Sequence, residues 1–187
     1  MKLGLFFTRG VSLESWIDTG ILVREKLLYE AHLNSGLFSS VTWITYGDGD
    51  EELASKLISA GVLDERISVI QMPRIFSIGF VGVTIYSFLS PIILKNQLSN
   101  CTIFKSNQTD GCWSALIAGA LYKRPTLLRS GYPLGRFYIG HRYIYKFVQF
   151  IESLLFNFAN FISITSNEYR RYLLEELKVN GKNIVVI

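Results

Sequence analysis

The sequence predicts an α/β fold with a doubly wound, mostly parallel sheet of about seven strands and helices on both faces of the sheet. Three observations support this prediction. Short apolar runs, of the kind found in strands that are buried on both faces, recur along the chain. Longer segments with apolar residues at helical spacing lie between them. Polar clusters follow several of the runs, as expected for loops at the ends of strands.

The composition is that of one folded domain that spans residues 1–187. Hydrophobic residues make up 49% of the chain and charged residues 18%, and no internal repeat, low-complexity tract or linker divides it. The formal net charge of +4 suits an anionic partner, which leaves a membrane surface or a phosphate open. Nucleic-acid binding is not expected, because a dense stripe of Lys and Arg is missing.

Three strands are predicted in the first part of the chain, at residues 2–7, 41–46 and 67–70. Two helices are predicted between them. The first covers residues 13–31, where Ser12 is a candidate N-cap and apolar residues recur at helical spacing. The second covers residues 51–60 and ends before Gly61.

Residues 75–94 form a run of 20 without a charged side chain, which reaches the length of a transmembrane helix. The run also holds Gly, Ser, Thr and Pro, and a span would place the strands before and after it on opposite sides of a bilayer. We therefore do not expect a span. Two alternatives stay open: a buried helix kinked near Pro91, or an exposed apolar face that rests on a membrane beside Arg74 and Lys95.

The centre of the chain predicts one right-handed crossover unit. A strand at residues 102–104, a polar loop, a helix rich in small residues and a strand at 126–128 follow each other. The later elements are predicted as a helix at 137–158, a strand at 161–165, a helix capped by Ser166 and a strand at 183–187. This order is Rossmann-like, and such sheets bind ligands outside the carboxyl ends of their strands.

Several kinds of site are not expected. The first strand is not followed by a Gly-x-Gly-x-x-Gly fingerprint or a phosphate-binding loop, which removes the main support for a dinucleotide or nucleotide-hydrolysing site. His32 and His141 lack the spacing of zinc ligands, so no metal site is predicted. Cys101 and Cys112 would lie at opposite ends of a strand, too far apart for a disulfide. Without a disulfide or a signal-peptide pattern, the protein is expected in the cytoplasm.

Polar residues at the predicted strand ends are the best candidates for a site, and each has a structural alternative. Arg129 could bind a phosphate or carboxylate, or form a salt bridge across the sheet edge. Asp110 could act as a base for a hydroxyl group, or cap the helix that follows it. Arg9 and Gly10 could face an anion at the next helix N-terminus, or form a turn.

Six segments occur in a characteristic order: Lys105-Ser-Asn-Gln-Thr-Asp-Gly111, Trp113-Ser-Ala-Leu-Ile-Ala-Gly119, Lys123-Arg-Pro125, Arg129-Ser-Gly-Tyr132, Phe158-Ala-Asn-Phe-Ile-Ser-Ile-Thr-Ser166 and Asn183-Ile-Val-Val-Ile187. With their intervals, they resemble the N-terminal half of GT-B glycosyltransferases of the large retaining family four. The resemblance covers nearly the whole chain.

The resemblance implies two Rossmann-like domains that face a cleft, of which the N-terminal one binds the acceptor and the C-terminal one binds the nucleotide sugar. It implies catalytic roles for Asp110 and Arg129. The implied acceptor-binding residues are Lys105, Asn107, Gln108, Gly131 and Tyr132. The first loop, with Arg9, Gly10 and Ser12, would approach the donor phosphates or the acceptor.

The chain departs from the family pattern in two ways. Its first loop lacks the paired glycines that many members have, and residues 1–187 do not contain the paired-glutamate motif of the donor-binding half. We therefore expect the acceptor-binding domain of a glycosyltransferase of hexosyltransferase type, inactive as this chain alone. It would need a donor-binding domain or subunit, with a nucleotide sugar as donor and no cofactor bound by this chain.

The expected reaction is transfer of a sugar to a glycan, lipid-linked at the inner face of the membrane, as in polysaccharide biosynthesis. Ile75–Leu94 would supply the peripheral membrane contact. The alternative function is a non-catalytic module that docks to a membrane or to a partner protein through a basic, aromatic surface.

Overall fold

One seven-stranded sheet forms the centre of the computed structural model, which describes residues 1–187 apart from the side chain of Lys182. Neighbouring strands are parallel, and their order is β3-β2-β1-β4-β5-β6-β7. The strands are β1 (Lys2–Phe6), β2 (Ser40–Ile44), β3 (Ile67–Ile70), β4 (Ile103–Ser106), β5 (Thr126–Ser130), β6 (Phe161–Ile164) and β7 (Ile184–Val186). The order reverses direction between β1 and β4, as in doubly wound sheets. The predicted fold class is confirmed.

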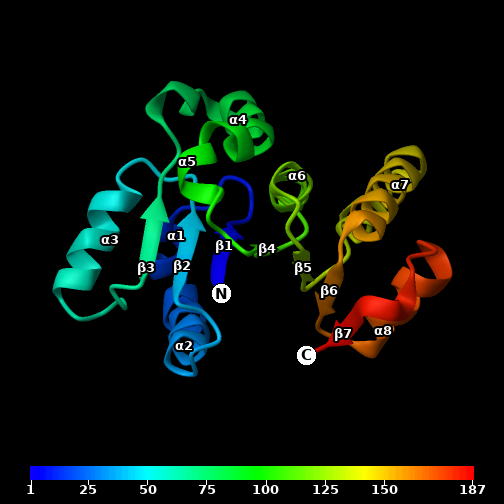
Figure 1. Ribbon diagram of the computed structural model, residues 1–187. Coiled ribbons are helices and arrows are strands. Elements are labelled where there is room, and N and C mark those ends of the chain that lie inside the picture. The colour runs from blue at the N-terminus through cyan, green and yellow to red at the C-terminus, as the bar shows by residue number, and fades with distance from the viewer.

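Helices cover both faces of the sheet (Figure 1). On one face lies α2 (Ile21–Asn34), and on the other lie α4 (Gly79–Ile93), α6 (Cys112–Tyr122) and α7 (Arg142–Phe158). The β3 edge is flanked by α3 (Asp50–Ser59), and the β7 edge by α8 (Asn167–Arg171). The shorter elements are α1 (Leu13–Asp18), α5 (Lys95–Leu98), the 3-10 helices Arg74–Phe76, Leu134–Tyr138 and Gly181–Asn183, and a π-helical turn, Tyr172–Glu176.

Buried aromatic side chains position the loop that follows β1. The Phe7 ring stacks on Trp16 of α1 with ring centroids 3.8 Å apart. Trp16 in turn meets Trp43 of β2 edge-on, at 5.4 Å between centroids. Offset-stacked and edge-on aromatic pairs are favourable beyond the area that they bury. These contacts hold α1 against the sheet and so fix the path of residues 8–12.

Two predicted helices differ from the structure. The helix predicted over residues 13–31 is divided into α1 and α2, because Gly20 takes a left-handed conformation with φ of +71°. The helix predicted from residue 137 begins at Arg142 instead. The turn before it, Leu134–Tyr138, is separate because the carboxylate of Glu152 accepts hydrogen bonds from its first two amides.

Most of the uncharged run of residues 75–94 forms α4, which continues through Pro91 and ends at Ile93. Proline cannot donate to the carbonyl of Ser87, four residues earlier. The hydroxyl of Ser114 in α6 donates to that carbonyl instead, so α6 satisfies the group that the proline leaves without a partner. Among the described helices, none is long and apolar enough to cross a membrane.

The apolar side of α4 faces away from the sheet. The side chains that α4 buries belong to Tyr86, Ser87, Ser90 and Pro91, whereas large apolar side chains are exposed, with Phe80 at 71%. A buried core helix would show the reverse arrangement. The first of the two alternatives for residues 75–94, a buried helix, is therefore wrong.

Both cysteines are buried and free, as the sequence predicts. Burial raises the pKa of the Cys101 thiol and, more strongly, that of the Cys112 thiol. A buried thiol with a raised pKa has little thiolate and is unreactive. Cys112 thus packs as a small apolar residue at the start of α6.

Candidate ligand site at the carboxyl edge of the sheet

The candidate site lies where the strand order reverses, between β1 and β4. The loop after β1 (residues 7–12) and the loop after β4 (residues 107–111) leave the sheet there, and the loop after β5 (residues 131–133) lies beside them. Parallel sheets bind ligands in the crevice outside their carboxyl ends, at this kind of reversal. Each residue predicted for the site lies in these loops or at the end of β4 or β5.

Arg9 and Asp110 form a two-point ion pair between the first two loops. Nε of Arg9 donates to Oδ1 of Asp110 at 2.9 Å, and Nη2 donates to Oδ2 at 3.2 Å. The backbone supports the pair, because the Arg9 amide donates to the Asp110 carbonyl at 3.2 Å. Asp110 keeps 31% of its side chain exposed, so the carboxylate is oriented by Arg9 and still reachable from solvent.

The Arg9 side chain also contacts helices α4 and α6. Its Nη1 donates to the Thr84 hydroxyl at 2.9 Å, and its guanidinium lies 4.6 Å from the Phe80 ring centroid and 5.7 Å from that of Trp113. These distances are within the range of cation–π attraction. Arg9, Thr84 and Asp110 are called the α4-side cluster below.

The cap predicted as the alternative role of Asp110 is not formed. The N-cap of α6 is Gly111, with φ of +87°, and no side chain caps this helix end. Gly111 is required there, since an added Cβ would lie 2.9 Å from the backbone nitrogen of Arg9. This close approach lets the first two loops touch and frees Asp110 to pair with Arg9.

The first loop is a turn, which was the alternative to an anion site. The Val11 amide donates to the Thr8 carbonyl at 3.0 Å across Arg9 and Gly10. Ser12 caps α1 in a capping box with Ser15, as its sequence position predicts. Carboxylate oxygens of Asp50 already occupy the helix end, because Oδ2 of Asp50 accepts from the Leu13 amide at 2.9 Å.

Arg129 lies on the other face of the sheet, against α2. Its Nη1 donates to both carboxylate oxygens of Glu25, at 2.8 and 3.0 Å. Beside it, Nζ of Lys105 donates to the Tyr29 hydroxyl at 3.0 Å. Glu25, Tyr29, Lys105 and Arg129 are called the α2-side cluster below. The salt bridge predicted as the alternative role of Arg129 is present, and it ties β5 to α2.

Asp110 and Arg129, the two predicted catalytic residues, therefore belong to different clusters. Asp110 contacts the layer of α4 and α6 through Arg9, and Arg129 contacts the layer of α2. The catalytic roles of both stay predictions. Of the two, Asp110 is the more accessible, with 31% of its side chain exposed against 16% for Arg129.

The remaining predicted residues join the loops after β4 and β5. Oε1 of Gln108 accepts from the Gly131 amide at 2.9 Å, and Oδ1 of Asn107 accepts from Arg129 at 3.4 Å. The Nε2 of Gln108 has no hydrogen-bond partner in the described part of the chain and can serve a ligand. Tyr132 is half-exposed at the rim, next to the Phe137 ring.

Burial controls the ionisation of the α2-side cluster. Burial and, to a smaller extent, the nearby Arg129 lower the pKa of Lys105 to about 8, while Glu25 opposes the shift. Burial also raises the pKa of Tyr29, with Glu25 acting in the same direction. A lysine of this kind is held protonated at neutral pH at a cost to folding.

We expect Lys105→Met to reduce the pH dependence of stability. The pKa of Lys105 is about 8 in the folded protein and near 10.5 in the unfolded chain, which therefore binds more protons between these values. The free energy of unfolding therefore rises with pH in this window. Below the window it is reduced by the full cost of burying the protonated lysine. Urea unfolding at pH 7.5 and pH 9.5 should show the rise in the wild type and in the exposed-lysine control Lys123→Met. An undiminished rise in Lys105→Met would contradict the assignment.

Three residues that the sequence analysis did not predict contribute to the site: Glu25, Thr84 and Glu152. Glu25 had a signal, since it lies between Leu22 and Tyr29 on the buried face of α2. Glu152 is an acid in an otherwise uncharged stretch of α7 and is fully buried. Its carboxylate holds the loop after β5 by accepting from the Leu134 amide at 2.7 Å and from the Gly135 amide. Burial raises the pKa of Glu152, and the hydrogen bonds from these two amides oppose the shift.

A metal centre is not formed by the described residues, which contain no group of three or more His, Cys, Asp or Glu side chains able to hold an ion. His32 is in α2, where its ring packs edge-on against Phe38, and His141 precedes α7. The two histidines thus belong to different elements.

Comparisons with known proteins identify solved structures that share this fold. No family model and no curated protein sequence matches the chain. Among solved structures, Anabaena Alr3699/HepE in complex with UDP-glucose matches all of the chain with a TM-score of 0.57 and 10% identity. The lipopolysaccharide outer core galactosyltransferase WaaB matches all of it with a TM-score of 0.60 and 11% identity, and a Rickettsia africae glycosyltransferase with 0.50 and 17%.

The chain spans less than half the length of each of these structures, 43% of HepE, 45% of WaaB and 42% of the Rickettsia protein. At such low identity, the likeness shows a shared fold. The chain therefore has the fold of one part of known glycosyltransferases.

Proposed function

We propose that this chain is the acceptor-side half of a GT-B glycosyltransferase of the retaining, family-four type. The observation that carries the proposal is the coverage: all of this chain matches 42–45% of a galactosyltransferase and of another glycosyltransferase. A half of this kind presents the carboxyl edge of its sheet to a second half across a cleft. The partly exposed carboxylate of Asp110 and the amide nitrogen of Gln108 lie at that edge.

The proposed reaction moves a hexose from a nucleotide sugar to a glycan. The names of the similar structures support this class of donor and product, since one holds UDP-glucose and another is a lipopolysaccharide galactosyltransferase. In this proposal, Asp110 accepts a hydrogen bond from the acceptor hydroxyl, and Arg9 holds the carboxylate in orientation through its two-point contact.

Gln108, Asn107 and Tyr132 would position the acceptor, and Lys105 and Arg129 would hold β4 and β5 against α2 beneath it. Stabilisation of the leaving diphosphate would come mainly from the donor-binding half, because the cations of the described site are already paired within this chain. The chain alone is consequently proposed to be inactive.

We also propose that the acceptor is lipid-linked and that the enzyme works at the cytoplasmic face of a membrane. The exposed apolar side of α4, within Ile75–Leu94, supports peripheral contact of this kind. It is also the observation that favours the second candidate function, a non-catalytic docking module.

The test is transfer of radiolabelled hexose from UDP-glucose or UDP-galactose to a membrane lipid extract. We expect no transfer, and no UDP-glucose binding in calorimetry, with residues 1–187 alone. Co-expression with the polypeptide encoded immediately downstream should restore transfer. Turnover by residues 1–187 alone would contradict the assignment of donor binding to a second half, and no turnover with the downstream polypeptide would favour the docking module.

A further inference from the structure

An apolar groove of about 740 Å³ lies on the α4, α6 and α7 face and extends from Trp113 to the end of α6 that is remote from the candidate site. Its floor is α6, with Trp113, Leu116, Ile117 and Ala120. Its walls are Phe88 of α4 on one side and Leu155 and Phe158 of α7 on the other. The volume is in the range of small-molecule sites, about 300–1,000 Å³.

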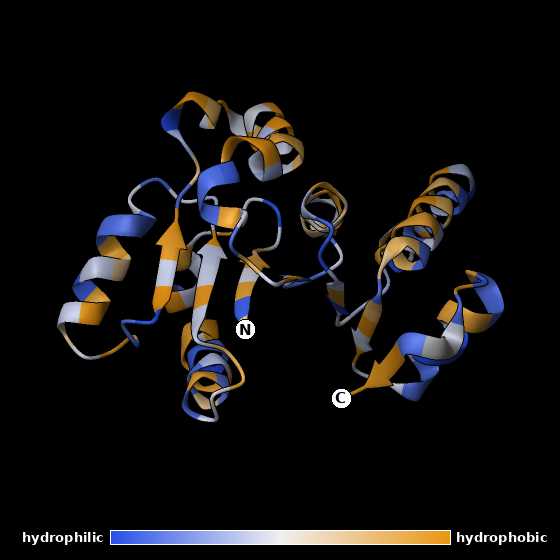
Figure 2. Ribbon diagram, viewed as in Figure 1, coloured by the Kyte–Doolittle hydropathy of each residue, from blue (hydrophilic) through white to orange (hydrophobic). Residues whose placement is uncertain are grey.

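The walls of the groove continue as exposed apolar stripes on both helices. On α7, large side chains recur at intervals of three or four residues and point away from the protein: Tyr143, Phe147, Phe150, Leu154 and Phe158. On α4 the corresponding side chains are Ile85, Phe88, Leu89 and Ile92. Figure 2 shows both helices largely orange and white on the same side of the sheet. Two such stripes beside a groove form one continuous apolar surface of the kind that marks an interaction site.

The charge on this part of the chain is strongly asymmetric. Residues 75–160 hold eight Lys and Arg residues but only two acids, Asp110 and Glu152. Neither acid offers a free negative charge, because Asp110 is paired with Arg9 and Glu152 is buried. Lys105 and Arg129 are directed to the α2 face, and the other six cations are not opposed by a free carboxylate from this stretch, so the α4, α6 and α7 face can attract an anionic partner.

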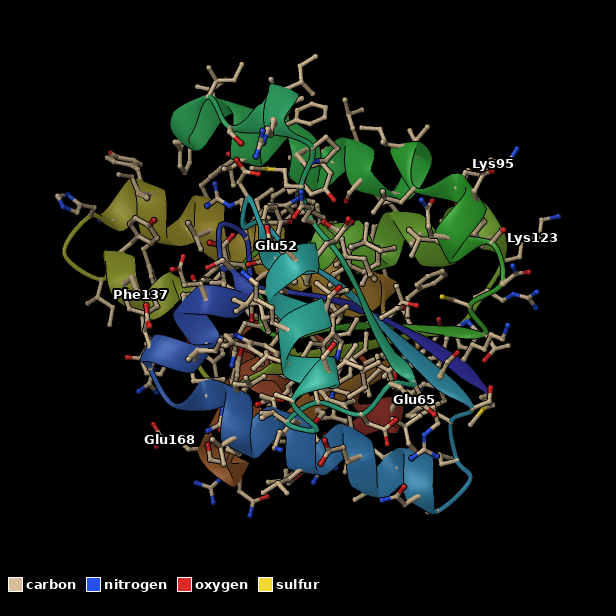
Figure 3. All side chains as sticks on the ribbon, turned by 90° about the vertical axis from the view of Figure 1, so that its left-hand side faces the viewer. Glu52, Glu65, Lys95, Lys123, Phe137 and Glu168 are labelled. Carbon is tan, nitrogen blue, oxygen red and sulfur yellow. The ribbon has the colours of Figure 1, made fainter. Side chains whose placement is uncertain are left out.

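Two of the cations stand at one end of the groove. Lys123 and Arg124 line it, both are exposed, and neither side chain has an ion-pair or hydrogen-bond partner among the described residues. Lys95 lies at the same end of the molecule as Lys123, opposite Phe137 and Glu168 at the carboxyl edge (Figure 3). The groove thus combines an apolar length with a basic end.

We propose that this groove binds an acyl chain of an anionic bilayer phospholipid, whose phosphate contacts Lys123 and Arg124. An acyl chain fits the apolar floor and walls, and a phosphate fits the unpaired cations at the end. The stripes on α4 and α7 then lie in the surrounding lipid. Because α6 has 11 residues, about 16 Å of helix separates this end from the loop of Asp110. The phosphate end of the groove is thus remote from the loop of Asp110, whereas Trp113 at the other end of α6 lies 5.7 Å from the guanidinium of Arg9.

The direct test uses Trp113, the one groove-lining tryptophan among three in the chain. Trp16 and Trp43 are buried elsewhere in the core and serve as an internal reference. We expect vesicles that contain phosphatidylglycerol with brominated acyl chains to quench the Trp113 fluorescence. Vesicles of brominated phosphatidylcholine alone should quench it much less.

Two matched pairs of variants locate the site. Ala120→Phe fills the groove, whereas Leu121→Phe adds a ring next to it on an exposed position outside it. We expect Ala120→Phe to abolish the quenching and to weaken binding to phosphatidylglycerol vesicles about tenfold, and Leu121→Phe to retain both. The double variant K123E/R124E should weaken vesicle binding by a similar factor, and R170E/R171E on α8, with the same change in charge, should leave it within twofold.

Three results would overturn the proposal: equal binding to both kinds of vesicle, equal behaviour of Ala120→Phe and Leu121→Phe, or no quenching of Trp113 in protein that is bound to vesicles. A stable dimer in solution that only Ala120→Phe dissociates would assign the groove to a second copy of the chain instead. These outcomes are independent of the transfer assay, so failure of either proposal leaves the other testable.

Discussion

Glu25→Ala is expected to lower the free energy of unfolding by about 3–5 kcal/mol, the usual cost of removing one partner of a buried ion pair. Glu25 is 1% exposed and accepts two hydrogen bonds from Arg129. Without it, the partly exposed Arg129 and the neighbouring buried Lys105 have no carboxylate between them. Urea denaturation followed by tryptophan fluorescence measures the change.

Glu30→Ala is the matched control for this prediction. Glu30 lies on the same helix, is partly exposed and forms no ion pair in the described part of the chain, so its removal should cost less than about 0.5 kcal/mol. The double variant Glu25→Leu with Arg129→Met should recover part of the lost stability, because it removes both charges of the Glu25–Arg129 pair and so relieves the repulsion between Arg129 and Lys105. A loss below about 1 kcal/mol for Glu25→Ala would show that the cluster is solvated.

Asp110→Asn is expected to lower kcat/KM for sugar transfer by about 10²–10⁴ in the complete enzyme, the range for loss of a general base. The amide has nearly the shape of the carboxylate but cannot take a proton. Rates of transfer from a nucleotide sugar, measured with both halves present, test this expectation.

Asp48→Asn controls for loss of an ion pair at the same edge. Asp48 pairs with Arg74 at 3.0 Å in an exposed loop, and we expect its replacement to change transfer less than twofold. Arg9→Met separates the two roles of Asp110: it removes the orienting contact but keeps the carboxylate, so we expect a loss of only about tenfold. Full activity in both Asp110→Asn and Arg129→Met would favour the docking module.

The sheet was predictable because its strands are buried on both faces. Runs such as residues 2–7 and 67–70 are mostly apolar and lie within one residue of the observed β1 and β3. The break between α1 and α2 was harder to predict. Apolar residues continue at helical spacing across Gly20, whereas its left-handed φ ends α1. Helical spacing records which side chains are buried, and it does not record a backbone rotation at a residue without a side chain.

The position of the candidate-site residues at one edge of the sheet was predictable, but their pairing was not. Polar residues after β4 and β5 do lie at one sheet edge, because parallel strands end on the same side. Their partners come from far along the chain: Arg9 pairs with Asp110 over 101 residues, and Glu25 with Arg129 over 104. Whether a strand residue faces α2 or α6 depends on register and on where its chain leaves the sheet. This is why Lys105 and Arg129 meet on one face and Asp110 lies on the other.

The side chain of Arg9 has a mechanical consequence. One guanidinium donates both to Thr84, on the helix that carries an exposed apolar stripe, and to Asp110, at the opening of the candidate cleft. A displacement of α4 would therefore be transmitted to Asp110 through a single rigid, planar group. Since such linkage is reciprocal, a ligand that tightens on Asp110 would change the affinity of α4 for its surroundings by the same factor. Arg9 is thus the residue at which surface attachment and substrate capture would be energetically coupled.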